Sequence, residues 1–272
     1  MTEFSTLLYR EAAGVAWVTL NRPAVLNSFN FQMQEELRSL WRSLRQNDEV
    51  RCVVLTAAGD RAFCTGIDRT EVMGEAAAGG EKRVGAASTP FMFDDPGAHL
   101  GPKSNDLWKP VIAAVNGMAC GGAFYMLGEV EFIIAAEHAT FFDPHVTYGM
   151  TAAFEPMHML QKMPFGEIMR LSLLGSHERL SARRAHEIGL VSEVVAGEDL
   201  AEAARWAAET IASQPPLAVQ GTLRALWAAR ELSRSQALGL GYAFIGLGTN
   251  RDSLRAGQEA FAGGKRIKPR IR

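Results

Sequence analysis

Apolar residues along this chain fall into two patterns, which predict strands and helices respectively. Residues 7–20 predict a hairpin-like pair of strands, and the β-branched runs at 50–55 and 110–115 predict buried strands. Residues 30–47 carry apolar side chains at helical spacing, which predicts a helix. A further short strand is expected at 132–136. A strand–strand–helix cycle recurs without a fixed sequence period, so no simple repeat is visible.

The last part of the chain, from about residue 199, carries a helical pattern only. Its predicted helices span residues 200–213, 217–231, 233–247 and 253–262. The segment 70–107 differs from the rest, because its Gly and Pro content predicts a long irregular stretch. Loops of this length are uncommon unless they are functional or disordered, and both alternatives stay open for this one.

The segment 109–127, KPVIAAVNGMACGGAFYML, carries the most chemical information. An apolar run leads to Asn-Gly at 116–117, then to Gly-Gly at 121–122, and then to a helix-like stretch. This order predicts a buried strand, a tight turn and the start of a buried helix. We expect backbone N–H groups of residues 121–123 to be unpaired there, where they can hold an oxyanion. On this segment alone, a purely structural turn is an equally good interpretation.

A second loop of small residues strengthens the oxyanion interpretation. Residues 52–55 predict a strand, 57–60 a turn, and 62–68 a loop in which Gly66 permits a close backbone approach. Two such loops, each following a buried strand, can present one N–H group apiece to a single carbonyl oxygen.

Five motifs in this order resemble those of the crotonase superfamily, the enoyl-CoA hydratase/isomerase family. They are NRPAVLNSF at 21–29, AFCTGID at 62–68, KPVIAAVNGMACGG at 109–122, FFDPHVTYG at 141–149 and SARRAHEIGLVSEVV at 181–195. The resemblance implies an α/β fold, the crotonase (ClpP-like) spiral of ββα turns with a C-terminal helical part. It places the crotonase core, with its acyl-CoA and oxyanion-hole site, at 1–200. A helical trimerisation part with a basic tail follows at 201–272.

The same resemblance assigns the catalytic positions. It implies that the N–H groups of Ile67 and Gly122 hold the thioester carbonyl and stabilise an enolate. The two positions where the usual hydratase carries glutamates are occupied by Tyr125 and His145. Ordinary hydration of a simple enoyl-CoA is therefore not expected to be efficient. Glu155, ten residues beyond His145, is a further carboxylate that would face the pocket from the next turn.

The two replacements differ in their chemistry. Histidine has an ordinary pKa of about 6.5, so His145 is the candidate general base near neutral pH. Tyr125, with an ordinary pKa near 10, is a poor base but can donate a hydrogen bond. Asp143 and Tyr148 flank His145 and would orient it. Space-filling roles for Tyr125 and His145 remain alternatives.

Coenzyme A is polyanionic, whereas the chain has a net charge of −2, so local positive groups are needed. The resemblance implies contacts from Arg22, from the backbone of Ala62, Phe63 and Cys64, and from Lys265 in the basic tail. A solvated tail without a ligand role is the alternative.

Composition narrows the class further. The chain has 272 residues, 47% hydrophobic content and three cysteines, which form no disulfide framework. The histidines show no metal-binding spacing, and no leader-like segment precedes the first strand. We therefore expect a cytoplasmic protein with no metal and no cofactor apart from the CoA thioester as substrate carrier. Neither nucleic acid nor membrane is an expected partner, and the resemblance implies a homotrimer or a dimer of trimers.

Three functional classes are compatible with these observations. The first is an acyl-CoA lyase or isomerase of the enoyl-CoA hydratase/isomerase family that stabilises a thioester enolate. The second is a crotonase-type hydrolase or C–C bond-cleaving enzyme that uses His145. The third is a non-catalytic acyl-CoA binder, which two convergent oxyanion donors argue against.

Overall fold

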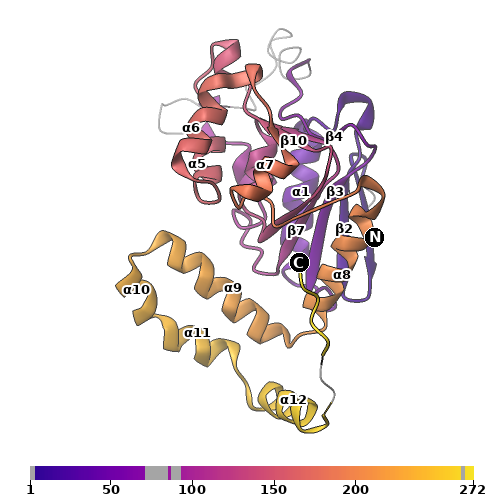
Figure 1. Ribbon diagram of the computed structural model, residues 1–272, viewed down its shortest axis with the longest axis vertical. Helices are drawn as coiled ribbons and strands as arrows, with labels where there is room; N and C mark the ends of the chain where they lie inside the picture. Colours follow the sequence, from indigo (N-terminus) through magenta and orange to yellow (C-terminus); the bar gives the residue numbers. More distant parts are fainter. Residues whose placement is uncertain (1–3, 71–84, 87–92, 265–266) are drawn as a thin grey trace. The chain divides into compact units, whose positions relative to one another are not determined.

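The computed structural model describes residues 4–70, 85–86, 93–264 and 267–272, and it consists of two compact units (Figure 1). The first unit is Met1–Ala212 and the second is Ser213–Arg272. The division falls after Ala212 and not after residue 200, because helix α8 (Leu200–Ala212) packs its alanine-rich face into the core of the first unit.

A six-stranded sheet with the order β1-β2-β3-β7-β9-β12 forms the centre of the first unit. Only β1 and β2 pair antiparallel, and the other neighbours are parallel. The strands are β1 (Leu7–Ala12), β2 (Val15–Leu20), β3 (Cys52–Ala57), β7 (Val111–Val115), β9 (Phe132–Ala136) and β12 (Glu193–Val195). The predicted strands lie here, and β3 and β7 are buried along nearly their whole length, as continuous apolar runs in parallel sheets are.

A smaller sheet has the strand order β11-β10-β8-β4. Its strands are β4 (Ala62–Cys64), β8 (Met118–Cys120), β10 (Thr140–Phe142) and β11 (Leu180–Ser181). Strands β4, β8 and β10 pair in parallel, and each follows a strand of the large sheet through a short turn. These three-residue strands are too short for a period to show, which is why 62–68 was expected to be a loop throughout. A third sheet pairs β5 (Gly85–Ala86) with β6 (Phe93–Asp94).

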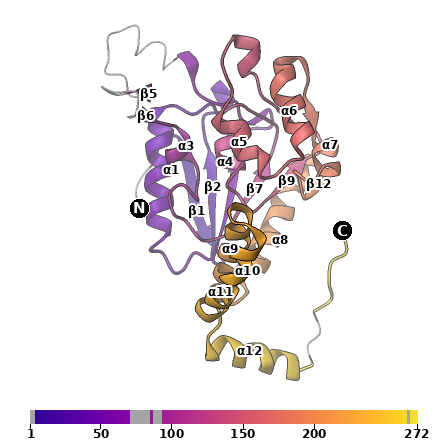
Figure 2. The ribbon, with the colours of Figure 1, turned by 90° about the vertical axis from the view of Figure 1, so that its left-hand side faces the viewer.

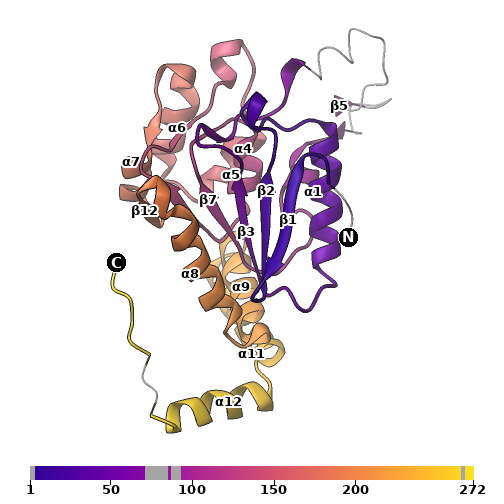
Figure 3. The ribbon, with the colours of Figure 1, turned by 90° about the vertical axis from the view of Figure 1, so that its right-hand side faces the viewer.

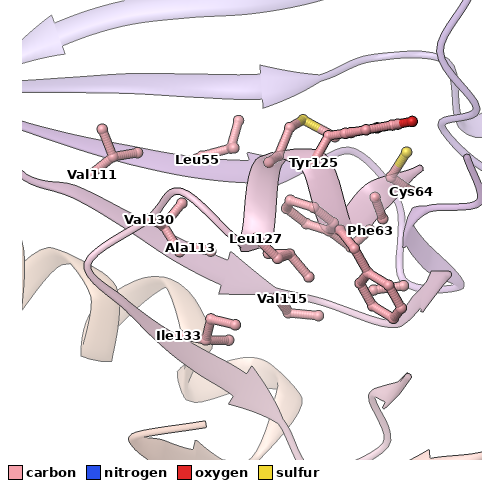
Figure 4. Close-up of a cluster of buried hydrophobic side chains, with 14 of the residues drawn as sticks. Leu55, Phe63, Cys64, Val111, Ala113, Val115, Tyr125, Leu127, Val130 and Ile133 are labelled. Carbon is pink, nitrogen blue, oxygen red and sulfur yellow. The ribbon is translucent and has the colours of Figure 1, made fainter. Parts of the chain in front are cut away.

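Alternate residues of the large sheet face two separate apolar clusters. Val53 and Leu55 of β3 join the cluster that contains helix α1 (Phe31–Leu44), whereas Cys52 and Val54 join the cluster that contains α8. Figure 4 shows the first cluster, in which residues of β3, β7 and β9 meet helix α4. Helices α1 and α8 therefore cover opposite faces of the sheet (Figure 3).

Short helices complete the first unit. They are α3 (Gly97–Leu100), α4 (Ala123–Leu127), α5 (Phe154–Leu160), α6 (Phe165–Leu174) and α7 (Ala182–Glu187), with the 3₁₀ turns η1 (Pro23–Val25), η2 (His145–Tyr148), η3 (Gly175–His177) and η4 (Gly197–Asp199). Every residue of α4 is buried, and α5 lies beside it (Figure 2). The predicted buried strand and buried helix at 109–127 are thus β7 and α4, but the segment between them, expected to be a turn, also contains the short strand β8. None of the described helices has the length and apolar content that a bilayer span requires.

The regular secondary structure of the second unit consists of helices in its described part. Its helices are α9 (Pro216–Glu231), α10 (Arg234–Gly239), α11 (Gly241–Gly248) and α12 (Arg251–Ala262). The single helix expected at 233–247 is two helices, because the chain turns between Gly239 and Gly241. Helices α9 and α11 approach closely where Gly221 meets Gly248: a Cβ on Gly221 would lie 2.9 Å from the Gly248 Cα.

Candidate functional site

A cavity of about 560 Å³ lies where the three parallel strands of the smaller sheet end. Its walls include residues at the ends of these strands: Thr65 directly after β4, Gly121 directly after β8, and Pro144 two residues after β10. Ligand sites in α/β proteins commonly lie at the carboxyl ends of parallel strands, because the loops that carry functional groups converge there. The topology therefore brings the sequence motifs at 62–68, 109–122 and 141–149 to one place.

The first loop forms a parallel β-bridge with Phe29. The Phe29 N–H donates to the Gly66 carbonyl at 2.9 Å, and the Asp68 N–H donates to the Phe29 carbonyl at 2.8 Å. Ile67 lies between Gly66 and Asp68, the two residues that bond to Phe29. In a parallel bridge the N–H group of this middle residue points away from the partner strand and forms no hydrogen bond with it. Gly66 has a φ of +85°, which a residue with a side chain rarely adopts.

The second loop passes directly over the first. A Cβ on Gly66 would lie 3.1 Å from the Gly122 nitrogen, and a Cβ on Gly122 would lie 2.6 Å from the Phe29 ring. Of the N–H groups expected to be unpaired at 121–123, that of Gly121 donates to the Phe142 carbonyl at 3.3 Å. The N–H groups of Ile67 and Gly122 meet no acceptor within the described part of the chain. Both residues line the cavity, so two backbone donors remain available to a ligand.

His145 lies between two carboxylates. Its Nδ1 is 2.5 Å from the Asp143 Oδ1, which also accepts the His145 backbone N–H at 3.0 Å. Its Nε2 is 3.3 Å from the Glu155 Oε1. Asp143 is fully buried and Glu155 nearly so. The imidazole also lies against the second loop, because its Cε1 is 3.6 Å from the place of a Cβ on Gly121.

These carboxylates change the protonation expected for His145. The hydrogen bonds to Asp143 and then to Glu155 raise the pKa of His145 to about 10 and outweigh the opposing effect of burial. At neutral pH the ring is therefore an imidazolium and a proton donor, in contrast to the base titrating near pH 7 that the sequence suggested. Burial is the largest single effect on the pKa of Glu155 and raises it, but the hydrogen bond and the charge of His145, together with further hydrogen bonds, outweigh burial and lower the pKa.

Tyr125 contacts a residue that sequence reasoning did not consider. Its hydroxyl donates to the Asp95 Oδ2 at 2.9 Å, and the side chain is buried. Burial, with the nearby charges of Glu155 and Asp95, raises the pKa of Tyr125 well above its ordinary value. Tyr125 therefore stays protonated and serves as a hydrogen-bond donor. Asp95 lies within the stretch expected to be irregular, where no periodicity could point to it.

The residues assigned to CoA contacts have different environments. The Arg22 guanidinium pairs with Asp68 at 2.9 Å and donates to the Ser28 carbonyl at 2.7 Å, so it ties the 22–28 loop to the oxyanion loop. The side chains of Ala62, Phe63 and Cys64 are buried in β4, which leaves only their backbone for a ligand. Lys265 lies outside the described residues.

The cysteines beside the cavity are neutral thiols. Burial raises the pKa of the Cys64 and Cys120 thiols to about 12, so neither is a thiolate at neutral pH. Among the residues that the structure describes, no group of three or more His, Cys, Asp or Glu side chains could hold a metal ion.

Sequence reasoning also did not single out two arginines that line the cavity. Arg69 follows the first oxyanion loop and Arg179 precedes β11, and both line the cavity. Neither belongs to a motif whose spacing would have singled it out, since an isolated arginine in a loop carries no sequence signal of its own.

Comparison with known proteins is consistent with this geometry. Residues 10–268 match a family model described as enoyl-CoA hydratase/isomerase. The (E)-benzylidenesuccinyl-CoA hydratase of Thauera aromatica is 33% identical over 95% of each chain, and the 1,2-epoxyphenylacetyl-CoA isomerase of Escherichia coli is 36% identical over 79% of this chain and 78% of its own. A crystal structure of an enoyl-CoA hydratase/isomerase from Mycobacterium paratuberculosis superposes with a TM-score of 0.84, at 32% identity and 99% coverage of both chains.

Proposed function

Because the chain belongs to the enoyl-CoA hydratase/isomerase family and has the crotonase fold, we propose that it is a lyase or isomerase acting through a thioester enolate. The N–H groups of Ile67 and Gly122 form its oxyanion hole. The observation that carries this proposal is the pair of backbone donors without acceptors, on two crossing loops, in the same cavity as His145. One oxyanion donor contributes about 3–4 kcal/mol to catalysis in other enzymes.

The His145–Glu155 pair supplies the proton transfers in this proposal. The Glu155 carboxylate removes the proton α to the thioester, and the resulting enolate is held by the two N–H groups. The His145 imidazolium then gives its proton to the leaving β-hydroxyl in a dehydration, or to another carbon in an isomerisation. The proton on Glu155 returns to neutral His145 across their 3.3 Å contact, which restores both groups.

The same geometry argues for a restricted substrate. Acid and base are in contact with each other, so they are poorly placed to hold a free water on the far side of a simple enoyl group. We therefore propose low activity with crotonyl-CoA and higher activity with a substrate whose α-proton is more acidic. A hydrolase or C–C bond-cleaving enzyme in which His145 activates water is less well supported, because that role needs a neutral imidazole. A non-catalytic binder would have no use for the paired acid and base.

CoA binding and assembly complete the proposal. The backbone of Ala62–Cys64, Arg22 and Lys265 of the tail are proposed to contact the CoA moiety, and no further cofactor is needed. A homotrimer or dimer of trimers is supported by large apolar side chains exposed in the second unit: Leu226, Leu238, Tyr242, Ile245, Leu247 and Phe261. Light scattering at micromolar concentration should give a mass of three or six chains, and a stable monomer of 29.6 kDa would refute this part.

Exchange of the α-proton tests the central step without knowledge of the natural substrate. Saturated acyl-CoA thioesters incubated in D₂O should acquire deuterium at the α-carbon with the wild-type protein. Glu155→Gln should slow this exchange, because it removes the proposed base, and Glu209→Gln, at an exposed position of α8, should leave it unchanged. Absence of exchange across a panel of acyl-CoA thioesters would refute an enolate mechanism.

A further inference from the structure

Two arginines in the cavity wall have no role in the proton transfers proposed above. The Arg69 guanidinium lies over the Tyr148 ring, 5.0 Å from its centroid, and the Arg179 guanidinium lies over the Phe142 ring at 4.6 Å. All four side chains line the cavity that contains the oxyanion donors. A guanidinium stacked on an aromatic ring keeps its N–H edges free and fixed in direction, which suits two parallel bonds to a carboxylate.

The acidic neighbours of both arginines are engaged elsewhere. Asp68, next to Arg69, pairs with Arg22 at 2.9 Å. Glu178, next to Arg179, accepts bonds of 2.6 and 2.5 Å from Arg170. Over the described ranges, neither Arg69 nor Arg179 forms an ion pair with a carboxylate of the chain.

The carboxylates around His145 do not neutralise these arginines either. Glu155, which lines the cavity, is bonded to His145, and Asp143 is fully buried on the other side of the same imidazolium. The positive charges of Arg69 and Arg179 therefore face the cavity, while its carboxylates are already paired with the His145 imidazolium. Such a cavity attracts an anionic ligand group and disfavours an exclusively apolar one.

We propose that this cavity selects acyl-CoA thioesters whose acyl group carries a carboxylate, and that Arg69 and Arg179 bind that carboxylate. The inference rests on the proposed function, because the thioester must first lie in the oxyanion hole. A carboxylate held there also orients the acyl chain, so the α-carbon lies beside Glu155 in one pose. The phosphates of CoA are a second source of anionic oxygens, and the experiment separates the two.

The test compares ligands that differ only in that charge. Binding of succinyl-CoA, glutaryl-CoA and adipyl-CoA, of their ω-methyl esters and of free CoA is measured by titration calorimetry. The proteins are the wild type, Arg69→Met, Arg179→Met and the control Arg183→Met, whose side chain is exposed outside the cavity. For at least one chain length, the wild type should bind the carboxylate about tenfold more tightly than the ester, equal to about 1.4 kcal/mol.

The variants should remove this preference selectively. Arg69→Met and Arg179→Met should each lose most of it while binding the esters and free CoA as the wild type does, and Arg183→Met should retain it. Equal binding of ester and carboxylate at all three lengths would overturn the inference and leave the enolate mechanism standing. Equal weakening of free CoA would also overturn it, by assigning the arginines to phosphates. Failure of every thioester to bind would refute the proposed function itself.

Discussion

The Nε2 of His145 lies 3.3 Å from the Oε1 of Glu155, so an acid and a base of opposite charge share one hydrogen bond in the cavity. The pair joins a 3₁₀ turn that follows β10 to the first turn of α5. Asp143 holds the other ring nitrogen of His145, which fixes the imidazolium between two carboxylates. The pKa of His145 therefore depends on Asp143 and Glu155 together.

Glu155→Gln should affect both the rate and the pH dependence. Loss of the base should reduce α-proton exchange by about 10²-fold to 10⁴-fold. Loss of its charge should also lower the pKa of His145, since Glu155 is one of the two groups that raise it. The alkaline limb of residual kcat/KM, where His145 loses its proton, should move to lower pH. Glu209→Gln, at an exposed position of α8, is the control, and an unshifted alkaline limb would contradict the coupling.

Thermal stability should report the raised pKa of His145 independently of catalysis. A histidine whose pKa is about 6.5 when unfolded and about 10 when folded stabilises the fold fully below pH 6.5. This stabilisation is lost as the pH rises towards 10. The difference in Tm between the wild type and His145→Gln should therefore be largest in mild acid and shrink in alkali, as measured by differential scanning fluorimetry. A Tm difference between the two proteins that grows with pH would contradict a raised pKa of His145 in the folded protein.

Gly122→Ala should disrupt the oxyanion hole sterically. The new Cβ would lie 2.6 Å from the Phe29 ring, so either the ring or the Gly122 N–H must move. We expect a loss of about 10²-fold to 10³-fold in kcat, comparable to removal of one oxyanion donor. Gly166→Ala is the matched control, because nothing lies within 4 Å of its Cβ. Combining Gly122→Ala with Phe29→Leu should recover part of the activity, and full activity of Gly122→Ala alone would exclude the assignment.

Tyr125→Phe should lower the free energy of unfolding, while the rate of α-proton exchange should change little. The change leaves the half-buried Asp95 carboxylate without the hydroxyl that donates to it at 2.9 Å, and a hydrogen bond to a charged group contributes about 1.5–3 kcal/mol. Urea denaturation should show this loss, and Tyr242→Phe, at an exposed ring, should not. Because Tyr125 stays protonated, α-proton exchange should change little at temperatures where the variant is folded. Abolished exchange with unchanged stability would instead make Tyr125 a catalytic group.

The sequence predicted the elements that long patterns encode. Strands β3, β7 and β9 and helices α1 and α8 lie where apolar runs or helical spacing placed them. The glycine loops indicated two places of close backbone approach, at Gly66 and at residues 121–123, because such an approach leaves a local sequence signal. The choice of Ile67 and Gly122 as donors came from the resemblance to the crotonase superfamily and stays a prediction.

What the sequence left open depends on contacts between distant segments. The chain separates Asp95 from Tyr125 by 30 positions, and only the packing of α3 against α4 brings them together. The pKa of His145 could not be predicted from its ordinary value, because it depends on where α5 directs Glu155. Arg69 and Arg179 became candidates only once their neighbours Asp68 and Glu178 were seen to pair elsewhere.

Where the 62–68 and 109–122 loops cross, the site combines fixed groups of the main chain with side chains that can be exchanged. The two proposed oxyanion donors belong to the main chain, and Gly66 and Gly122 allow the close approach of the loops. In the proposed mechanism, the reaction of the thioester depends instead on side chains such as those of Tyr125, His145 and Arg69, which the same backbone would carry in other combinations. Exchange of a few cavity side chains should thus redirect the chemistry of this protein without a new fold.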